Sequence, residues 1–193
     1  MKNKIEAKFP GQNFPAYGTD KIYIMDYSNQ TNNVRGIEWS NSTPTDIAAF
    51  IINNTPLLDI TFCAFKENTI KLAGETKEIS HCEGVLFPTD NTDKTWIIFL
   101  ELKYPKKEEN LGTNMKNARE QLFLTLDLFK EQGIIKEKRL VYLIFSAPKY
   151  TNKTPFESWS MQPNELKEIR KTKSAIIRGV NSIDIISNES LKV

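Results

Sequence analysis

Apolar residues recur with two different periods along the chain, and together they predict a sheet with helices packed against it. Segments rich in β-branched and aromatic residues are typical of strands, and they lie at residues 57–65, 79–87, 95–104 and 139–146. A long segment that begins near Thr113 or Asn114 shows helical spacing instead. Its apolar face comprises Met115, Ala118, Leu122, Leu126 and Phe129. The order strand, strand, helix, strand predicts an α/β fold with a central mixed β-sheet flanked by helices.

The first part of the chain is less regular. Residues 1–42 contain prolines, glycines and a polar stretch, and they predict an irregular segment in which residues 21–25 alternate like a strand. A helix is expected to begin at Thr43, because threonine is a good N-cap and Pro44 suits the first helical position. Its apolar face would comprise Ile47, Phe50 and Ile51.

The last part of the chain predicts a loop, a short helix over residues 164–172 and a last edge strand over residues 182–186. No internal repeat or clear domain boundary interrupts the pattern. We therefore expect an irregular N-terminal segment at residues 1–42, a core at residues 43–147, and a C-terminal extension at residues 148–193 that packs on the same domain.

The strand predicted over residues 95–104 combines an apolar body with a charged end. It is apolar on both faces from Trp96 to Leu100, which is typical of a central strand covered on both sides. Glu101-Leu102-Lys103 follows, and the period of two puts Glu101 and Lys103 on the same face. Charged groups in such a place cost desolvation free energy, which points to a functional role. Glu-x-Lys occurs four times in the chain, but only this copy lies on a strand expected to be buried.

A second carboxylate follows from hairpin geometry. If residues 79–87 and 95–104 pair antiparallel about a turn near residue 92, Glu83 lies opposite Glu101. Directly opposed residues have Cβ atoms roughly 4.5–5.5 Å apart, and two like charges there are unfavourable unless a cation separates them. Mg²⁺ would serve, because it binds one or two carboxylates together with water and substrate oxygens. Asp90 is a rival acid, but it belongs to the turn, so we prefer Glu83.

Composition and charge narrow the classes of function. The chain has 193 residues, of which 39% are hydrophobic and 26% charged, and this balance is typical of a soluble globular protein. A net charge of +2 gives no overall field that would indicate a nucleic-acid binder. With two cysteines, Cys63 and Cys82, and one histidine, His81, a disulfide scaffold, a Cys/His zinc site and a histidine-based triad are all disfavoured. No segment is typical of a secretory signal or a membrane span, so we expect a cytoplasmic protein.

At these residues the sequence resembles the PD-(D/E)XK nuclease superfamily, whose core is the restriction-endonuclease-like fold. Glu83 matches the family's first acid, Glu101-Leu102-Lys103 matches its (D/E)xK motif, and Gln121 matches a helix glutamine seen in several branches. The order helix, three strands, helix, strand also fits, over about residues 43–147. Two features depart from the family pattern: glutamate replaces the more usual aspartate at 83, and Cys82 precedes it instead of proline.

The resemblance implies hydrolysis of a phosphodiester by a bound Mg²⁺, with Mn²⁺ as the alternative ion. Glu83 and Glu101 would be the metal ligands. Lys103 would orient or activate the attacking water, or stabilise the transition state electrostatically. Gln121 would position Lys103 or a phosphate oxygen. A further acid of the family, often on the first helix, would correspond to Asp46.

The expected partner is nucleic acid, DNA in particular, and a homodimer is compatible with the sequence. Four basic residues in the loop and helix after the motif are candidates for contacts to the phosphate backbone: Lys106, Lys107, Lys116 and Arg119.

Two alternatives remain open. Inactive members of this superfamily exist, so the chain could be a nucleic-acid- or protein-binding module on the same scaffold. It could also be an unrelated α/β domain with a protein partner, in which Glu101 and Lys103 form a structural ion pair. That second alternative predicts that Glu83 and Glu101 lie on opposite faces of the sheet.

Overall fold

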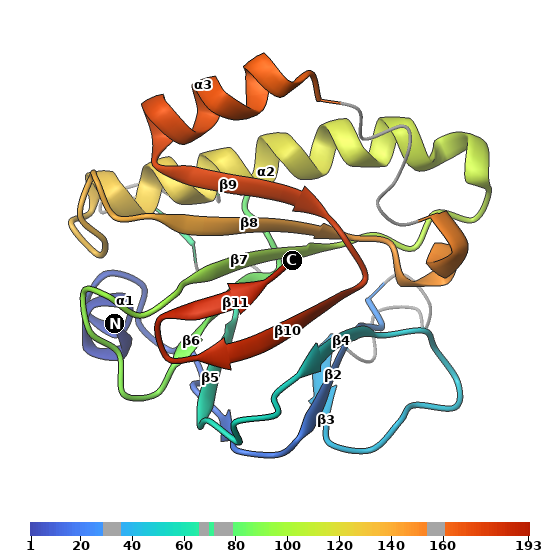
Figure 1. Cartoon of the computed structure of the whole chain (residues 1–193), viewed down its shortest axis with the longest axis horizontal. Helices are drawn as coiled ribbons and strands as arrows, with labels where there is room; N and C mark the ends of the chain where they lie inside the picture. Colours follow the sequence, from blue (N-terminus) through green and yellow to red (C-terminus); the bar gives the residue numbers. More distant parts are fainter. Residues whose placement is uncertain (29–35, 66–69, 72–78, 154–160) are drawn as a thin grey trace.

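Two β-sheets form the framework of the protein (Figure 1). The computed structural model describes residues 1–28, 36–65, 70–71, 79–153 and 161–193. The first sheet has six strands in the order β1 (Ala16–Tyr17), β5 (Ile60–Ala64), β6 (Gly84–Pro88), β7 (Ile98–Leu102), β8 (Val141–Ser146) and β9 (Ala175–Gly179). The second sheet has five strands in the order β11 (Ser190–Lys192), β10 (Ser182–Ser187), β4 (Phe50–Asn53), β2 (Lys21–Asp26) and β3 (Ile37–Ser40).

Both sheets are mixed. In the first sheet, neighbours from β1 to β7 pair antiparallel, while β7, β8 and β9 run parallel. In the second sheet, β4 and β10 are parallel and the other pairs are antiparallel. The α/β class with mixed sheets and flanking helices is therefore confirmed.

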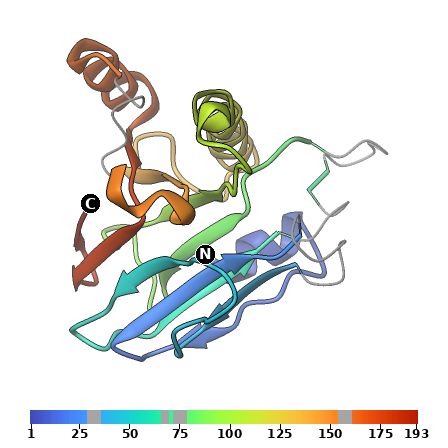
Figure 2. The ribbon, with the colours of Figure 1, turned by 90° about the vertical axis from the view of Figure 1, so that its right-hand side faces the viewer.

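The helices and the second sheet cover opposite faces of the first sheet. Figure 2 shows α2 (Leu111–Glu131) and α3 (Pro163–Lys173) on one side of it and the second sheet on the other. The short helix α1 (Lys2–Lys8) contributes Ile5 to the same core as α2. Two short 3₁₀ helices complete the secondary structure of the described residues: η1 (Glu108–Asn110) and η2 (Pro148–Lys153).

Alternation along the strands fills two separate cores. Ile97, which directly precedes β7, and Phe99 face the core under α2, whereas Ile98, Leu100 and Leu102 face the core between the sheets. The predicted apolar face of α2, from Met115 to Phe129, is buried in the first of these cores. Phe129 lies at its centre, with the rings of three other phenylalanines 5.1–5.9 Å from its own: Phe9, Phe65 and Phe99.

The helix predicted from Thr43 is wrong. Residues 50–53 form strand β4, which pairs with β2 on one side and β10 on the other. Ile51 and Ile52 are β-branched and suit a strand. Thr43 precedes Pro44 as predicted but does not cap a helix. Its hydroxyl donates a hydrogen bond to the Tyr23 hydroxyl at 2.9 Å instead.

The ends of the chain are more ordered than the sequence indicates. Residues 1–42, expected to be irregular, contain α1, β1, β2 and β3, and the predicted strand over 21–25 is confirmed as β2. The predicted helix over 164–172 is confirmed as α3. The strand over 182–186 is confirmed as β10, but its edge position is wrong, because β10 lies between β4 and β11.

Candidate active site

Glu83 and Glu101 come together at the end of the β6–β7 hairpin, where Glu83 N donates to Glu101 Oε2. Gly84 pairs with Leu100, and Val85 pairs with Phe99. The regular pairing ends at Gly84, because Glu83 N donates at 3.0 Å to the carbonyl oxygen of Leu100, the residue that Gly84 already faces. The register predicted for the two strands is therefore confirmed from Gly84 to Leu86, and Glu83 and Glu101 adjoin its last pair at the end of the hairpin away from the turn.

Glu101 is fully buried, with 0% of its surface exposed. One carboxylate oxygen, Oε2, accepts a hydrogen bond from Glu83 N at 3.1 Å. The other, Oε1, forms an ion pair with Lys103 Nζ. Lys103 N donates to Ser146 O at 2.9 Å, which continues the β7–β8 pairing and keeps the backbone extended past the end of the strand. The shared face predicted for Glu101 and Lys103 thus results in direct contact.

Burial and crowding of negative charge favour the protonated form of both acids. Burial raises the pKa of Glu101 to about 7, although Lys103 and the Glu83 amide oppose the shift. The pKa of Glu83 is also raised well above its ordinary value, first by burial and then by the charges of Glu101 and Asp26. Ionisation of one of these carboxylates therefore disfavours ionisation of the other.

Lys103 stays protonated in this setting. Its side chain is 22% exposed, and burial alone would lower the pKa of its ammonium group. The three acids Glu101, Glu83 and Asp26 more than compensate, so the pKa of Lys103 lies above its ordinary value. The residue is thus a fixed positive charge at neutral pH.

Asp26 is a member of this cluster that the sequence analysis missed. It ends β2 of the second sheet and is 4% exposed. Its charge acts on Glu83, Glu101 and Lys103. The signal was present in the sequence, because Ile22-Tyr23-Ile24-Met25 is an apolar strand that ends in an acid, as β7 does.

Helix α2 positions the segment that leads into Glu83. Gln121 Nε2 donates to His81 O at 2.9 Å, and the Thr125 hydroxyl accepts a hydrogen bond from Cys82 N at 2.9 Å. Gln121 therefore holds the chain two residues before Glu83. Cys82 is fully buried, and burial raises the pKa of its thiol, so it remains protonated.

The four basic candidate residues lie in the segment after β7 and in α2. Lys106 and Lys107 follow β7 and are exposed, and Lys107 Nζ lies 3.4 Å from Glu109 Oε1. Lys116 is exposed and Arg119 partly exposed in the first half of α2.

Two other acids were candidates: Asp90 as the rival to Glu83, and Asp46 as the further acid of the family. Asp90 is exposed in the turn after β6. Asp46 is also exposed, and its Oδ1 accepts a hydrogen bond from the Tyr27 hydroxyl at 2.8 Å.

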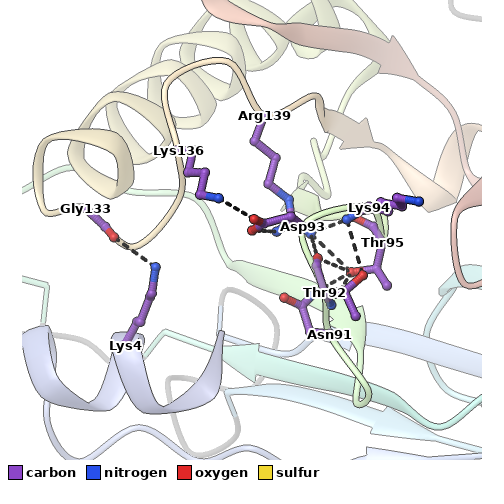
Figure 3. Close-up of polar contacts among 9 residues, drawn as sticks. All are labelled: Lys4, Asn91, Thr92, Asp93, Lys94, Thr95, Gly133, Lys136 and Arg139. Carbon is purple, nitrogen blue, oxygen red and sulfur yellow. Dashed lines mark hydrogen bonds and ion pairs between the residues drawn. The ribbon is translucent and has the colours of Figure 1, made fainter.

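A second polar cluster lies at the opposite end of β7 and fixes the hairpin turn (Figure 3). Arg139 Nη2 donates to Thr92 O at 2.5 Å and to Thr95 O at 2.7 Å. Asp93 forms ion pairs with Lys136 and Arg139. These contacts tie the β6–β7 turn to the connection between α2 and β8. They therefore help to fix the register of the hairpin.

Glu83 and Glu101 suit a hard divalent cation. Mg²⁺ takes one or two carboxylates from a protein and completes its octahedron with water and substrate oxygens. Burial first, and then the charge of Glu101, raise the pKa of Glu83, and a bound cation would favour the ionised form of both acids. In the part of the chain that the structure describes, no three Asp, Glu, His or Cys side chains form a complete set of cation ligands.

No family model, curated protein or solved structure matches the chain. The helices of the described ranges are all too short or too polar to cross a bilayer.

Proposed function

We propose that the protein is a Mg²⁺-dependent nuclease that hydrolyses phosphodiester bonds in DNA, with a site of the PD-(D/E)XK type on a restriction-endonuclease-like core. The observation that supports this proposal is the contact between a fully buried Glu101 and Lys103, with Glu83 N donating to Glu101 Oε2 at 3.1 Å. Glu83 offers a second carboxylate beside this ion pair, and Mg²⁺ binds one or two carboxylates from a protein.

Each residue has a distinct role in the proposed reaction. Glu83 and Glu101 hold the cation at the end of the β6–β7 hairpin. The bound ion would lower the pKa of a coordinated water and offset charge on the scissile phosphate. Because Lys103 is protonated, we assign it to orient the attacking water and to stabilise negative charge in the transition state, and not to act as the base. Gln121 positions Glu83 through the His81 carbonyl.

The basic residues near the site support a nucleic-acid substrate. Lys106 and Lys107 lie in the segment that connects β7 to α2, and Lys116 and Arg119 lie in the first half of α2. We assign them to the flanking phosphates, where contacts are independent of base sequence and sensitive to salt.

The direct test is cleavage of supercoiled plasmid DNA in MgCl₂ by the wild type, Glu101→Gln and Lys103→Met. We expect each substitution to lower the rate by about 100-fold or more, while the far-UV circular dichroism spectrum stays unchanged. The matched control is the double variant Glu6→Gln, Lys8→Met. It changes the same Glu-x-Lys spacing at exposed positions of α1 and should cleave at the wild-type rate.

Cleavage by both site variants at the wild-type rate would contradict the proposal. If the wild type binds DNA and Mg²⁺ but cleaves neither DNA nor RNA, the chain is instead a binding module on this scaffold.

A further inference from the structure

Helix α2 holds the peptide group that leads into Glu83. Strand β6 begins only after Glu83, and the peptide between His81 and Cys82 lies just before it. The carbonyl oxygen of this peptide accepts a hydrogen bond from Gln121 Nε2 at 2.9 Å. Its N–H donates to the Thr125 hydroxyl at 2.9 Å. Two side chains, one turn apart on α2, therefore bind the two polar ends of a single planar peptide.

The Thr125 hydroxyl makes one hydrogen bond more than its place in the helix requires. Thr125 is 0% exposed and lies beside the apolar face of α2. A buried threonine can satisfy its hydroxyl within the helix by donating to the carbonyl four residues earlier, and Thr125 donates to Gln121 O at 2.7 Å. The bond from Cys82 N is additional. Because Cys82 is also 0% exposed, loss of the hydroxyl would remove a partner from a buried N–H.

The backbone of Glu83 itself is tied to the neighbouring chain on both sides. Phe65 N donates to Glu83 O at 2.9 Å, and Glu83 N donates to Leu100 O at 3.0 Å. The sheet therefore holds Glu83 from two directions, and α2 holds the preceding peptide from a third. These contacts restrict the backbone angles through which Glu83 could turn its side chain away from Glu101.

We propose that Thr125 is a positioning residue for the cation site. Its hydroxyl and the Gln121 amide orient one peptide, and that peptide keeps Glu83 beside Glu101. This inference rests on the proposed function, in which the two acids hold the ion. Groups that orient metal ligands typically change metal affinity by about 10–100-fold when they are removed. Thr125 acts through one intervening residue, so we expect an effect at the lower end of this range.

Binding of Mn²⁺ to the nucleic-acid-free protein tests the inference. Isothermal titration calorimetry would compare the wild type with Thr125→Val, which keeps the shape of the side chain and removes the hydroxyl. We expect Thr125→Val to bind Mn²⁺ about 10-fold more weakly. Thr125→Ser, which keeps a hydroxyl, should bind more tightly than Thr125→Val.

Thr61→Val is the matched control. Thr61 is also a buried threonine, 4% exposed, and its hydroxyl is hydrogen-bonded to the Thr89 hydroxyl at 2.8 Å. It lies opposite Phe87, toward the end of β6 away from Glu83. The control should bind Mn²⁺ as the wild type does, while urea unfolding measures the stability that each variant loses. An equal loss of Mn²⁺ affinity in both threonine variants would show that destabilisation alone weakens the site, and it would overturn the inference.

A second variant keeps the test decisive if Thr125→Val does not fold. Gln121→Met removes the other hydrogen bond to the same peptide, at a partly exposed position of α2. It should also weaken Mn²⁺ binding by about 10-fold. Wild-type affinity in Gln121→Met would overturn the role of this peptide.

The outcomes distinguish this inference from the proposed function. Mn²⁺ binding by the wild type with equal affinity in Thr125→Val would overturn the role of Thr125 alone. An absence of Mn²⁺ binding by the wild type would overturn the proposed metal site, and the role of Thr125 with it.

Discussion

At the scale of single residues, Glu101 is stabilised by few groups for an acid with no solvent exposure. Its carboxylate accepts one backbone hydrogen bond and pairs with one ammonium group, while two further acids lie near it. A buried carboxylate without full compensation shifts toward its protonated form. Burial of this charge therefore lowers the free energy of unfolding of the cation-free protein, and binding of a cation would offset the loss.

The pH dependence of stability in EDTA should show this destabilisation. The pKa of Glu101 rises from an ordinary 4.5 to about 7 on folding. Protonation of Glu101 therefore contributes fully to the free energy of unfolding below about pH 4.5, and this contribution is lost as the pH rises through about 7. We expect Glu101→Gln, which mimics the protonated acid, to have a higher Tm than the wild type at pH 8 and a similar Tm at pH 5. Thermal melts at both pH values measure this, and a lower Tm at pH 8 would show that the Lys103 ion pair outweighs the burial of charge.

Local sequence patterns identified part of this cluster. Glu101 and Lys103 stand out because they end an apolar strand, and the period of two places them on one face. Asp26 ends an apolar strand in the same way. It was missed because the surrounding residues, rich in proline, glycine and asparagine, predicted an irregular segment.

At the scale of elements, close packing at Gly84 sets how β5 meets β6. Gly84 pairs with Ala64, and a Cβ atom at Gly84 would lie 2.5 Å from Cys63 O and 2.6 Å from a ring carbon of Phe62. No side chain fits there without movement of the strands. Because Gly84 directly follows Glu83, the same close approach fixes the backbone at the candidate site.

Gly84→Ala should therefore destabilise the protein by about 1–3 kcal/mol, as overpacking typically does. Urea unfolding followed by circular dichroism measures the change. Gly112→Ala is the control, because Gly112 is an exposed position of α2 with open space around it. It should raise stability by up to about 1 kcal/mol, since alanine is the better helix former. Equal stabilities for Gly84→Ala and the wild type would contradict the close approach.

Strand β4, which the sequence did not predict, depends on pairing with strands that are distant along the chain. Strand β4 lies between β2 and β10, and Asn53 bonds to Asp184, 131 residues further along the chain. A local N-cap signal at Thr43 cannot report such partners, and tertiary pairing overrides it. By contrast, α2 and the β6–β7 hairpin were predictable, because their apolar periodicity and their contacts are local.

At the scale of the whole molecule, the candidate site lies where the two sheets meet. The first sheet contributes Glu101 and Lys103, and the second contributes Asp26. The crossover from β9 to β10 lies near the same place. There the buried Asn181 accepts hydrogen bonds from the Ser146 hydroxyl at 2.9 Å and from Ala147 N at 3.0 Å. Because both sheets supply charged groups, a change in their packing would alter the site directly.

The most direct measurement is an anomalous difference map from crystals of the protein soaked in MnCl₂. The account predicts one strong peak between Glu83 and Glu101, at about 2.0–2.3 Å from an oxygen of each carboxylate. Manganese bound elsewhere, with the Glu101–Lys103 ion pair unchanged and no peak beside Glu83, would contradict it.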